Sequence, residues 1–371
     1  MFNIIRSFLF FLSTLIRKKQ YDVIFYYPQH FNRSLDGENV FFKDLLLTCI
    51  NNRISYVIFE EPDFTTSSKR SSVAIPFDFL YLLIVFLRKI YGVSLSPVLK
   101  DQKIGRIINK LFFRRIHFKK YITISQSMLS VFRGIREDVE LYDLQHGIIY
   151  NNKKNYLVNG IADDNLVLND TRLLVNGKGY KDLLISNDRS DYFKTHTFIL
   201  GSHIFSSKIS HVNFNNKILI TLQFTRDHSE QENNVLLEEL ETFILSLEGV
   251  MFYLKHHPRF NNEVDLSNIF SLPNVCSAPI YLNECFEVCS LHATFYSSCV
   301  FDAAISGIPT VFINSIINFN MFSDDFGYPF SNSVSDFRDL IVYQESSRLV
   351  QEWASKYYMP FNQSDFIKLM K

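Results

Sequence analysis

The chain has 371 residues, of which 47% are hydrophobic and 37 are phenylalanine, so it is long enough for two domains and apolar enough to bury their cores. This composition excludes a disordered or fibrous protein. Basic and acidic residues number 38 each, so the charge gives no support to nucleic acid as a partner.

Three segments of the N-terminal half, 1–19, 79–89 and 107–120, combine long apolar runs with Lys and Arg. The first has no cleavage site and carries its charge after the apolar run, which is not the pattern of a signal peptide. The first two runs are too short to span a bilayer. Two interpretations stay open, namely core helices with solvated basic rims and a peripheral contact with an anionic membrane face.

Strand and helix patterns alternate through the N-terminal half. We predict strands at 21–27, 54–59, 121–125, 139–145 and 165–168, with helices at 39–49 and from Ser127 onward. Strands separated by helices indicate parallel βαβ units.

A polar stretch at 206–216 predicts a domain boundary, after which the alternation restarts. Strands are expected at 217–223, 250–254, 274–276 and 310–314, and helices at 235–247, from Ser297 to Gly307, and in the tail from 337 to 371. The predicted class is therefore α/β, with two Rossmann-like domains (1–208 and 209–345) facing across a cleft. A helical tail, 346–371, is expected to cross back to the first domain.

Two elements of the second half place polar groups where strands end. His256 and His257, followed by Pro258, end the apolar run 250–254, and Ser297 and Ser298 precede a helix. An imidazole at a strand end can stabilise charge on a departing nucleotide, and hydroxyls at a helix start can donate to a phosphate. The alternative for the serines is a helix N-cap and nothing more.

Further donor-binding candidates lie near these elements. Asp302, one turn into the same helix, could hold a ribose hydroxyl or could merely complement the helix dipole. Gln223, Thr225 and Arg226 follow the first strand of this half and could approach a diphosphate or sugar, with arginine as the better clamp.

The N-terminal half offers candidates for a general base. His146 follows a strand and precedes a glycine, so it is either a base at the cleft or a buried, satisfied histidine. Asp36 and Glu38 flank Gly37 in the loop after the first strand and could deprotonate an acceptor hydroxyl, or could simply cap a helix.

Several signatures are missing from the chain. There is no P-loop, no GxGxxG after the first strand, no HExxH and no DxD pair, so the sequence gives no basis for a metal or another cofactor. The five cysteines have no metal-ligand spacing, and their odd number favours reduced structural thiols in a cytoplasmic protein.

Together the Gln145-His146-Gly147 element, the Lys255 to Pro258 strand end and the serine-pair helix resemble GT-B glycosyltransferases of bacterial surface-polysaccharide assembly. The pattern is similar to the sialyl-, polysialyl- and Kdo transferases that use CMP-sugars, and more distantly to teichoic-acid glycerophosphotransferases. The resemblance implies that His257, Ser297 and Ser298 bind the donor phosphate, with an acidic N-domain residue as base.

The predicted function is transfer of a sugar, from a CMP-sugar by preference, to a lipid-linked or growing glycan of lipopolysaccharide, O-antigen or capsule. The expected partners are the nucleotide sugar, the glycan acceptor and the inner face of the bacterial plasma membrane, with no nucleic acid. Two alternatives stay open, a non-hydrolysing nucleotide-sugar 2-epimerase and a catalytically degenerate nucleotide-sugar-binding protein.

Overall fold

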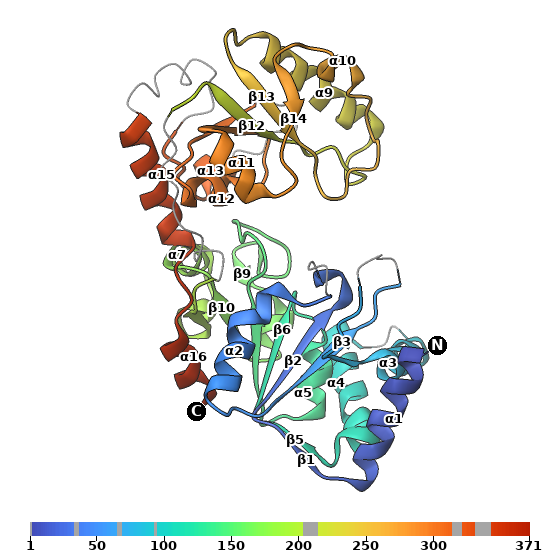
Figure 1. The fold of residues 1–371 in the computed structure, drawn as a ribbon. Coiled ribbons are helices and arrows are strands. Elements are labelled where there is room, and N and C mark those ends of the chain that lie inside the picture. Colours follow the sequence, from blue (N-terminus) through green and yellow to red (C-terminus); the bar gives the residue numbers. More distant parts are fainter. Residues whose placement is uncertain are drawn as a thin grey trace. The chain divides into compact units, whose positions relative to one another are not determined.

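The computed structural model describes residues 2–32, 37–64, 69–92, 95–202, 214–313, 321–330 and 343–371. The chain forms two compact units, which are described separately (Figure 1). The first unit comprises Met1–His203 together with Pro360–Lys371, and the second comprises Ile204–Met359. The last helix of the chain thus belongs to the first unit.

A seven-stranded sheet forms the centre of the first unit, and all its strand pairs are parallel. Its order is β11-β10-β7-β6-β2-β3-β4, so the chain runs outward in both directions from β2. This reversal between β2 and β6 is the switch point of a doubly wound sheet. The strands are β2 (Val23–Pro28), β3 (Tyr56–Glu61), β4 (Ile75–Pro76), β6 (Lys120–Ile124), β7 (Glu140–Leu144), β10 (Thr171–Val175) and β11 (Thr197–Ile199).

Helices cover both faces of this sheet. On one face, Phe25 of β2 packs with helices α2 (Lys43–Asn51) and α16 (Gln363–Met370) in one buried cluster. On the other, Tyr26 packs against Phe77 and Phe132 at centroid distances of 5.1 and 5.6 Å. Because β2 is buried on both faces, its sequence is continuously apolar rather than alternating.

The first unit also contains further helices, short helical turns and two small strand pairs. They are α1 (Phe2–Ile16), α3 (Asp78–Ile90), α4 (Pro97–Ile108), α5 (Leu129–Ile135), α6 (Asp164–Val167), α7 (Lys178–Asn187), α8 (Tyr192–His196), the short helical turns η1 (Gln29–Phe31), η2 (Val40–Phe42) and η3 (Asn109–Phe113), the parallel pair β1 (Lys19–Gln20) and β5 (Ile116–His117), and the hairpin β8 (Leu157–Val158) and β9 (Ile161–Ala162).

The second unit contains a five-stranded parallel sheet of order β14-β13-β12-β15-β16. Its switch point lies between β12 and β15. The strands are β12 (Lys217–Thr221), β13 (Met251–Lys255), β14 (Val275–Ser277), β15 (Leu291–Thr294) and β16 (Thr310–Phe312), and the helices are α9 (Glu230–Leu245), α10 (Ser267–Phe270), α11 (Leu282–Val288), α12 (Cys299–Ile305), α13 (Met321–Asp324) and α15 (Tyr343–Tyr357).

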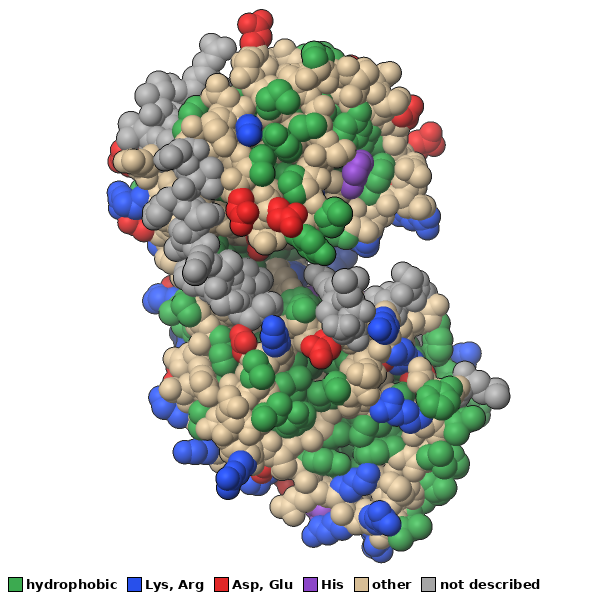
Figure 2. All heavy atoms as spheres, viewed as in Figure 1, with side chains coloured by type: hydrophobic (Ala, Val, Ile, Leu, Met, Phe, Trp, Pro, Cys, Tyr) green, Lys and Arg blue, Asp and Glu red, His purple; other side chains and the backbone are tan. Residues whose placement is uncertain are grey.

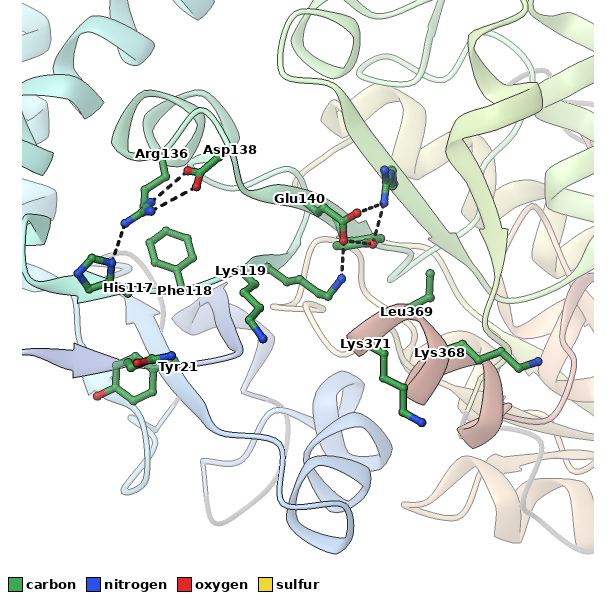
Figure 3. A pocket seen from close by; sticks show the side chains of 14 residues that line it. Tyr21, His117, Phe118, Lys119, Arg136, Asp138, Glu140, Lys368, Leu369 and Lys371 are labelled. Carbon is green, nitrogen blue, oxygen red and sulfur yellow. Dashed lines mark hydrogen bonds and ion pairs between the residues drawn. The ribbon is translucent and has the colours of Figure 1, made fainter.

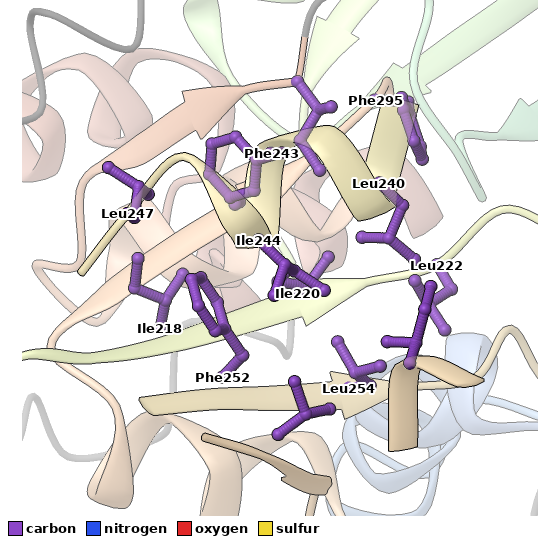
Figure 4. Packing of buried hydrophobic residues seen from close by; sticks show 14 of the residues in the cluster. Ile218, Ile220, Leu222, Leu240, Phe243, Ile244, Leu247, Phe252, Leu254 and Phe295 are labelled. Atoms are coloured by element: carbon purple, nitrogen blue, oxygen red, sulfur yellow. The ribbon is translucent and has the colours of Figure 1, made fainter. Parts of the chain in front are cut away.

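The core of the second unit lies between its sheet and α9 (Figure 4). Leu240, Phe243 and Ile244 point from the helix toward Ile220 and Phe252 of the strands. Deeper in the sheet, His292 is fully buried between the hydroxyls of Thr221 and Thr310, each 2.9 Å from a ring nitrogen. Desolvation lowers the pKa of His292 to about 3, so the ring stays neutral and joins β12, β15 and β16.

The predicted α/β class with parallel sheets is confirmed, but one predicted element is wrong. Residues 165–168 were expected to form a strand, whereas the structure has α6 there, because the Asp163 carboxylate accepts the N–H of Asn165 and starts a helical turn. Helix α9 also begins earlier than predicted, at Glu230, because Ser229 and Glu232 form a capping box.

The chain's last segment divides between the two units. Helix α15 packs on α12 in the second unit, where Trp353 stacks on Phe301 at 4.7 Å, whereas α16 packs in the first unit. The expected tail of 346–371 is thus two helices with different partners. All five cysteines are free thiols, three of them buried.

Candidate functional site

The polar residues predicted for the second unit follow three neighbouring strands. The loops that leave β13, β12 and β15 emerge at one edge of the sheet, because these strands are parallel and adjacent. We call this side the carboxyl edge of the second sheet. It includes the switch point between β12 and β15, where open α/β sheets bind ligands.

The two histidines of the loop after β13 differ in what their rings do. His257 Nδ1 accepts the backbone N–H of Arg259 at 3.1 Å, so the proton of a neutral ring lies on Nε2. The ring of His256 stacks on Phe260, with centroids 4.4 Å apart and planes at 15°. Partial desolvation and the charge of Lys255 lower the pKa of His256. His257 is therefore the better oriented donor.

The two serines also have different roles. Ser297 Oγ accepts the N–H of Cys299 at 3.2 Å and so supports the start of α12. Ser298 is the N-cap residue, yet its exposed side chain makes no capping hydrogen bond. Since α12 has only seven residues, the hydroxyls rather than the helix end are the chemical feature of this loop.

Gln223 and Thr225 hold the loops in place with their own polar atoms. Gln223 Oε1 accepts from Thr294 Oγ1 (3.0 Å) and from the Phe295 N–H (3.3 Å), and Gln223 Nε2 donates to the Thr221 carbonyl (2.8 Å). Both side chains are buried. Gln223 thus joins the turn after β12 to the end of β15, and Thr225 Oγ1 accepts the Asp227 N–H at 3.3 Å within that turn.

Arg226 lies in the same turn but faces solvent. Its side chain is 77% exposed, and its Nε lies 3.8 Å from a Glu263 carboxylate oxygen. Because the Arg226 guanidinium is exposed and its ion-pair partner is distant, its N–H groups can donate hydrogen bonds to an anionic ligand.

Two pairs that the sequence analysis did not single out connect the three loops. Asp227 and Arg259 form a bidentate ion pair between the loops after β12 and β13, with Nη1 and Oδ1 3.1 Å apart. His228 Nε2 and the Tyr296 hydroxyl form a hydrogen bond between the loops after β12 and β15. The charged run Arg226-Asp227-His228 in the loop after a predicted strand was the signal available in the sequence.

The pKa values in these pairs follow from their surroundings. Hydrogen bonds from Arg259 lower the pKa of Asp227, and the charges of Arg259, His228 and His257 act in the same direction. Desolvation raises the pKa of Tyr296 to about 12. Asp227 thus stays ionised while it ties a cationic loop to the cluster.

Asp302 lies on α12, and its side chain is half-buried. Desolvation raises its pKa to about 6. Such a carboxyl is costly to ionise when it is buried. Both interpretations of Asp302 stay open, namely an interaction with the dipole of α12 and a contact with a ribose hydroxyl.

In the first unit, His146 follows β7 and packs against two phenylalanines. Its ring centroid lies 4.9 Å from that of Phe31 and 6.4 Å from that of Phe41. The adjacent Gln145 is buried and accepts the Asn176 N–H at 2.8 Å, which holds the loop after β7. Phe31 follows β2, so the contact brings together loops from two strands of the sheet.

The acidic candidates lie in the loop after β2. Glu38 is exposed and borders a cavity of about 510 Å³ in the first unit, together with Tyr27, Asn39 and Ser71. Asp36 lies outside the described residues.

A left-handed turn follows β6, next to the switch point of the first sheet. Ser125, Gln126 and Met128 have φ values of 59°, 55° and 55°, a region that costs energy for residues other than glycine. The buried carboxylate of Asp143 accepts the Gln126 N–H at 2.7 Å and so holds this turn. Desolvation raises the pKa of Asp143 to about 7. Sequence patterns gave no indication of this turn.

A groove of about 600 Å³ lies at the opposite, amino edge of the first sheet (Figure 3). Lys120 and Arg172 both donate to Glu140 at 2.5 Å, and Arg136 pairs with Asp138 at 3.2 Å. Lys371 and Lys368 of α16 also border the groove. None of the predicted site residues that the structure describes lines this basic groove.

Neither a metal cluster nor a spanning helix is found in the described part of the chain. Within those residues, no group of three or more His, Cys, Asp or Glu side chains could hold a metal ion. No helix among them is long and apolar enough to cross a membrane.

Comparison with known proteins gives a structural result only. No known family profile matches the sequence, and no curated protein matches it. The fold is similar to that of the wall teichoic acid polymerase TagF, with a TM-score of 0.52, 12% identity, and coverage of 100% of this chain and 96% of that chain.

The fold is equally similar to two further structures. MnaA of S. aureus, in complex with UDP, has a TM-score of 0.54, 10% identity, and coverage of 94% of this chain and 95% of its own. A putative UDP-N-acetylglucosamine 2-epimerase from Listeria monocytogenes has a TM-score of 0.52, 12% identity, and coverage of 95% of both chains. The likeness to CMP-sugar transferases stays a prediction, and what these comparisons establish is a GT-B-like α/β fold.

Proposed function

We propose that this chain is a glycosyltransferase that moves a sugar from a nucleotide-activated donor, a CMP-sugar by preference, to a hydroxyl of a surface glycan. The acceptor would be a lipid-linked or growing lipopolysaccharide, O-antigen or capsule chain at the cytoplasmic face of the plasma membrane. The GT-B-like fold supports a nucleotide-sugar substrate, because the similar structures include a polymerase of wall teichoic acid and a complex with UDP.

The observation that carries the proposal is the convergence of three loops at the carboxyl edge of the second sheet. They bring His257, Ser298 and Arg226 to one edge, and the Asp227–Arg259 and His228–Tyr296 pairs link the loops to one another. N–H, O–H and guanidinium donors gathered at one edge suit a nucleotide phosphate.

In the proposed reaction, an acceptor hydroxyl attacks the anomeric carbon of the donor sugar. A base of the first unit, Asp36, Glu38 or His146, takes the proton of that hydroxyl. The bond between the anomeric carbon and the phosphate oxygen breaks, and the nucleotide leaves with the electron pair. His257 Nε2–H, Ser297, Ser298 and Arg226 stabilise its charge, with Gln223 and Thr225 positioning the loop and His256 beside it. Positioning and electrostatics supply the rate, without a covalent protein intermediate.

The first experiment identifies the nucleotide. Thermal unfolding of the full chain is measured with CMP, CDP, UDP, GDP and TDP, because a ligand that binds only the folded state raises the unfolding temperature. Selective stabilisation by CMP is expected. If no nucleotide raises the unfolding temperature, the proposal is wrong.

The second experiment tests the residue roles with the matching sugar nucleotide and a glycan acceptor. His257→Ala should lower kcat about 100-fold, as removal of one donor to a developing charge does. His257→Gln, which keeps an N–H donor, should recover part of that loss. His256→Ala is the matched control and should lose less, since its ring stacks on Phe260. Full activity of His257→Ala would remove this residue from the mechanism.

The similarity to an epimerase keeps a second function in view. An epimerase converts its nucleotide sugar without an acceptor, so incubation of the chain with the donor alone distinguishes the two. Isomerised donor in that reaction would favour the epimerase. Stabilisation by a nucleotide without turnover of any donor would favour a degenerate binding protein.

A further inference from the structure

Helix α1 turns two polar side chains toward the first unit. Ser7 and Thr14 are fully buried, and both are held by hydrogen bonds to distant segments. Ser7 Oγ accepts the Phe79 N–H at 3.2 Å, and Thr14 Oγ1 donates to the Phe112 carbonyl at 2.9 Å. Phe11, also buried, stacks on Phe59. These contacts determine which side of the helix faces outward.

The outward side of α1 is apolar. Phe2 and Ile16 are 78% and 77% exposed, and the residues between them on this side are exposed as well, namely Ile5, Phe8, Leu9, Leu12 and Leu15. A helix on a water-facing surface normally has the opposite arrangement, with polar residues outward. No other described segment covers these side chains.

Neighbouring elements extend the apolar surface. Helix α1 packs beside α3 and η3, through contacts such as Phe8–Phe79 at 5.1 Å. Helix α3 exposes Leu82, Phe86 and Ile90, and η3 exposes Leu111. We call the exposed side of α1, α3 and η3 the α1 face. In Figure 2, hydrophobic and basic side chains intermix over this part of the first unit.

The charge around the α1 face is strongly one-sided. Residues 2–19 and 78–115 contain 12 Lys and Arg but only two acids, in a chain whose charges otherwise balance. Both acids are neutralised within the fold, Asp78 by Arg70 at 2.7 Å and Asp101 by Arg88 at 2.6 Å. The basic residues are Arg6, Arg17, Lys18, Lys19, Arg88, Lys89, Lys100, Lys103, Arg106, Lys110, Arg114 and Arg115. Two of them are ion-paired within the fold, Arg88 with Asp101 and Arg106 with Glu137 at 3.1 Å.

We propose that the α1 face docks on an anionic lipid bilayer, with the apolar side chains in the headgroup and acyl boundary and the basic residues against lipid phosphates. Large apolar side chains with a basic rim are the composition of interfacial helices. The contact is interfacial, since no described helix can span a membrane. A second copy of this chain fits less well, because two faces of the same positive charge repel each other.

This surface would bring the enzyme to the lipid-linked acceptor of the proposed function, but its test needs no activity. The full chain is sedimented with vesicles of phosphatidylcholine alone and with vesicles that also contain phosphatidylglycerol. Binding is expected to be much stronger on the anionic vesicles and to weaken with salt.

Two variants separate the apolar and electrostatic parts. Leu9→Glu with Leu12→Glu should weaken binding to anionic vesicles at least about tenfold, since two exposed apolar side chains become acidic. Arg17→Ala with Lys18→Ala should weaken it about 25-fold, or about fivefold for each cation, with little change on neutral vesicles. All four residues are exposed, so circular dichroism should show an unchanged fold.

The matched control is Leu245→Glu, a change of an equally exposed leucine on α9 of the second unit. It should leave vesicle binding unchanged. The proposal is overturned if the α1 variants bind anionic vesicles as the unchanged chain does. It is equally overturned if the chain does not bind vesicles and Leu9→Glu instead dissociates a dimer, because the α1 face would then join two copies of the chain. Loss of transferase activity with intact vesicle binding would count only against the proposed function.

Discussion

At the scale of single residues, the two serines proposed to bind the nucleotide differ in whether they also support the fold. Ser297 accepts a backbone N–H at the start of α12, whereas Ser298 has an exposed side chain with no capping bond. The sequence places the two hydroxyls side by side but does not distinguish them.

This difference predicts different effects of two similar substitutions on the free energy of unfolding. Ser297→Ala should cost about 1 kcal/mol of unfolding free energy, because the Cys299 N–H loses its acceptor. Ser298→Ala should change stability by less than about 0.5 kcal/mol and weaken nucleotide binding instead. Denaturant unfolding and nucleotide-induced thermal shifts measure the two quantities. Equal losses of stability in both variants would contradict the assignment.

Asp302 has a pKa that predicts how stability depends on pH. Because its pKa is about 6 in the folded protein and 3.8 when unperturbed, the carboxyl supports folding at low pH, and this support is lost as pH rises through 6. Asp302→Asn should therefore change stability little at pH 4 and raise it by up to about 3 kcal/mol at pH 8.

Thermal unfolding of the unchanged chain and of Asp302→Asn, measured from pH 4 to pH 8, checks the Asp302 prediction. Asp265→Asn serves as a control of opposite sign, since backbone and side-chain bonds of Ser267 lower the pKa of Asp265. A gain from Asp302→Asn that does not vary with pH would contradict it. Weaker nucleotide binding by Asp302→Asn would instead support the predicted ribose contact.

At the scale of elements, α4 and α5 of the first unit approach each other backbone to backbone. A Cβ atom on Gly105 would lie 2.1 Å from the Val131 carbonyl oxygen, and one on Gly134 would lie 2.0 Å from that of Gln102. The two glycines therefore allow a contact that no larger residue would fit. Helix α5 in turn stacks Phe132 on Tyr121 of β6, so this contact positions a helix against the centre of the sheet.

Gly134→Ala should thus destabilise the first unit by about 2 to 3 kcal/mol, as overpacking of a core does. Gly147→Ala is the matched control, because a Cβ there meets nothing within 4 Å and its φ is not positive. Urea unfolding followed by circular dichroism measures both. An equal, small loss of unfolding free energy in both variants would contradict this prediction, because α4 and α5 would then move apart without destabilising the unit.

At the scale of the whole molecule, the end of the chain supports the unit in which the chain began. Phe366 and Met370 of α16 are buried in the same cluster as Val23 and Phe25 of β2. Residues 204–359 are therefore inserted, in sequence, between two parts of the first unit.

Removal of the largest of these contacts tests this arrangement. Phe366→Ala should destabilise the first unit by about 3 to 5 kcal/mol, since a fully buried aromatic ring is lost. Lys368→Ala on the exposed side of the same helix should cost less than about 0.5 kcal/mol. If unfolding shows two transitions, only that of the first unit should shift. A shift confined to the second unit would contradict the assignment of α16.

Much of the fold could be predicted because hydrophobic patterns are local. The runs around Val23, Ile122 and Ile218 are strands in the structure, and their alternation with helices predicts parallel sheets. The error at 165–168 shows the limit of pattern-based prediction, because a segment with only three consecutive apolar residues fits a strand and a helical turn equally well. The Asp163 cap decided between them.

The sequence by itself determined the parallel α/β architecture and the positions of His257 and the serine pair at strand ends, because residues after parallel strands must emerge at one edge of a sheet. Only the tertiary structure decided the Asp227–Arg259 and His228–Tyr296 pairs, since their members lie 32 and 68 positions apart. It alone also decided which side of α1 faces outward. The polar residues of that helix share one side, which the usual rule would place in solvent, whereas the hydrogen bonds of Ser7 and Thr14 hold this side against the first unit.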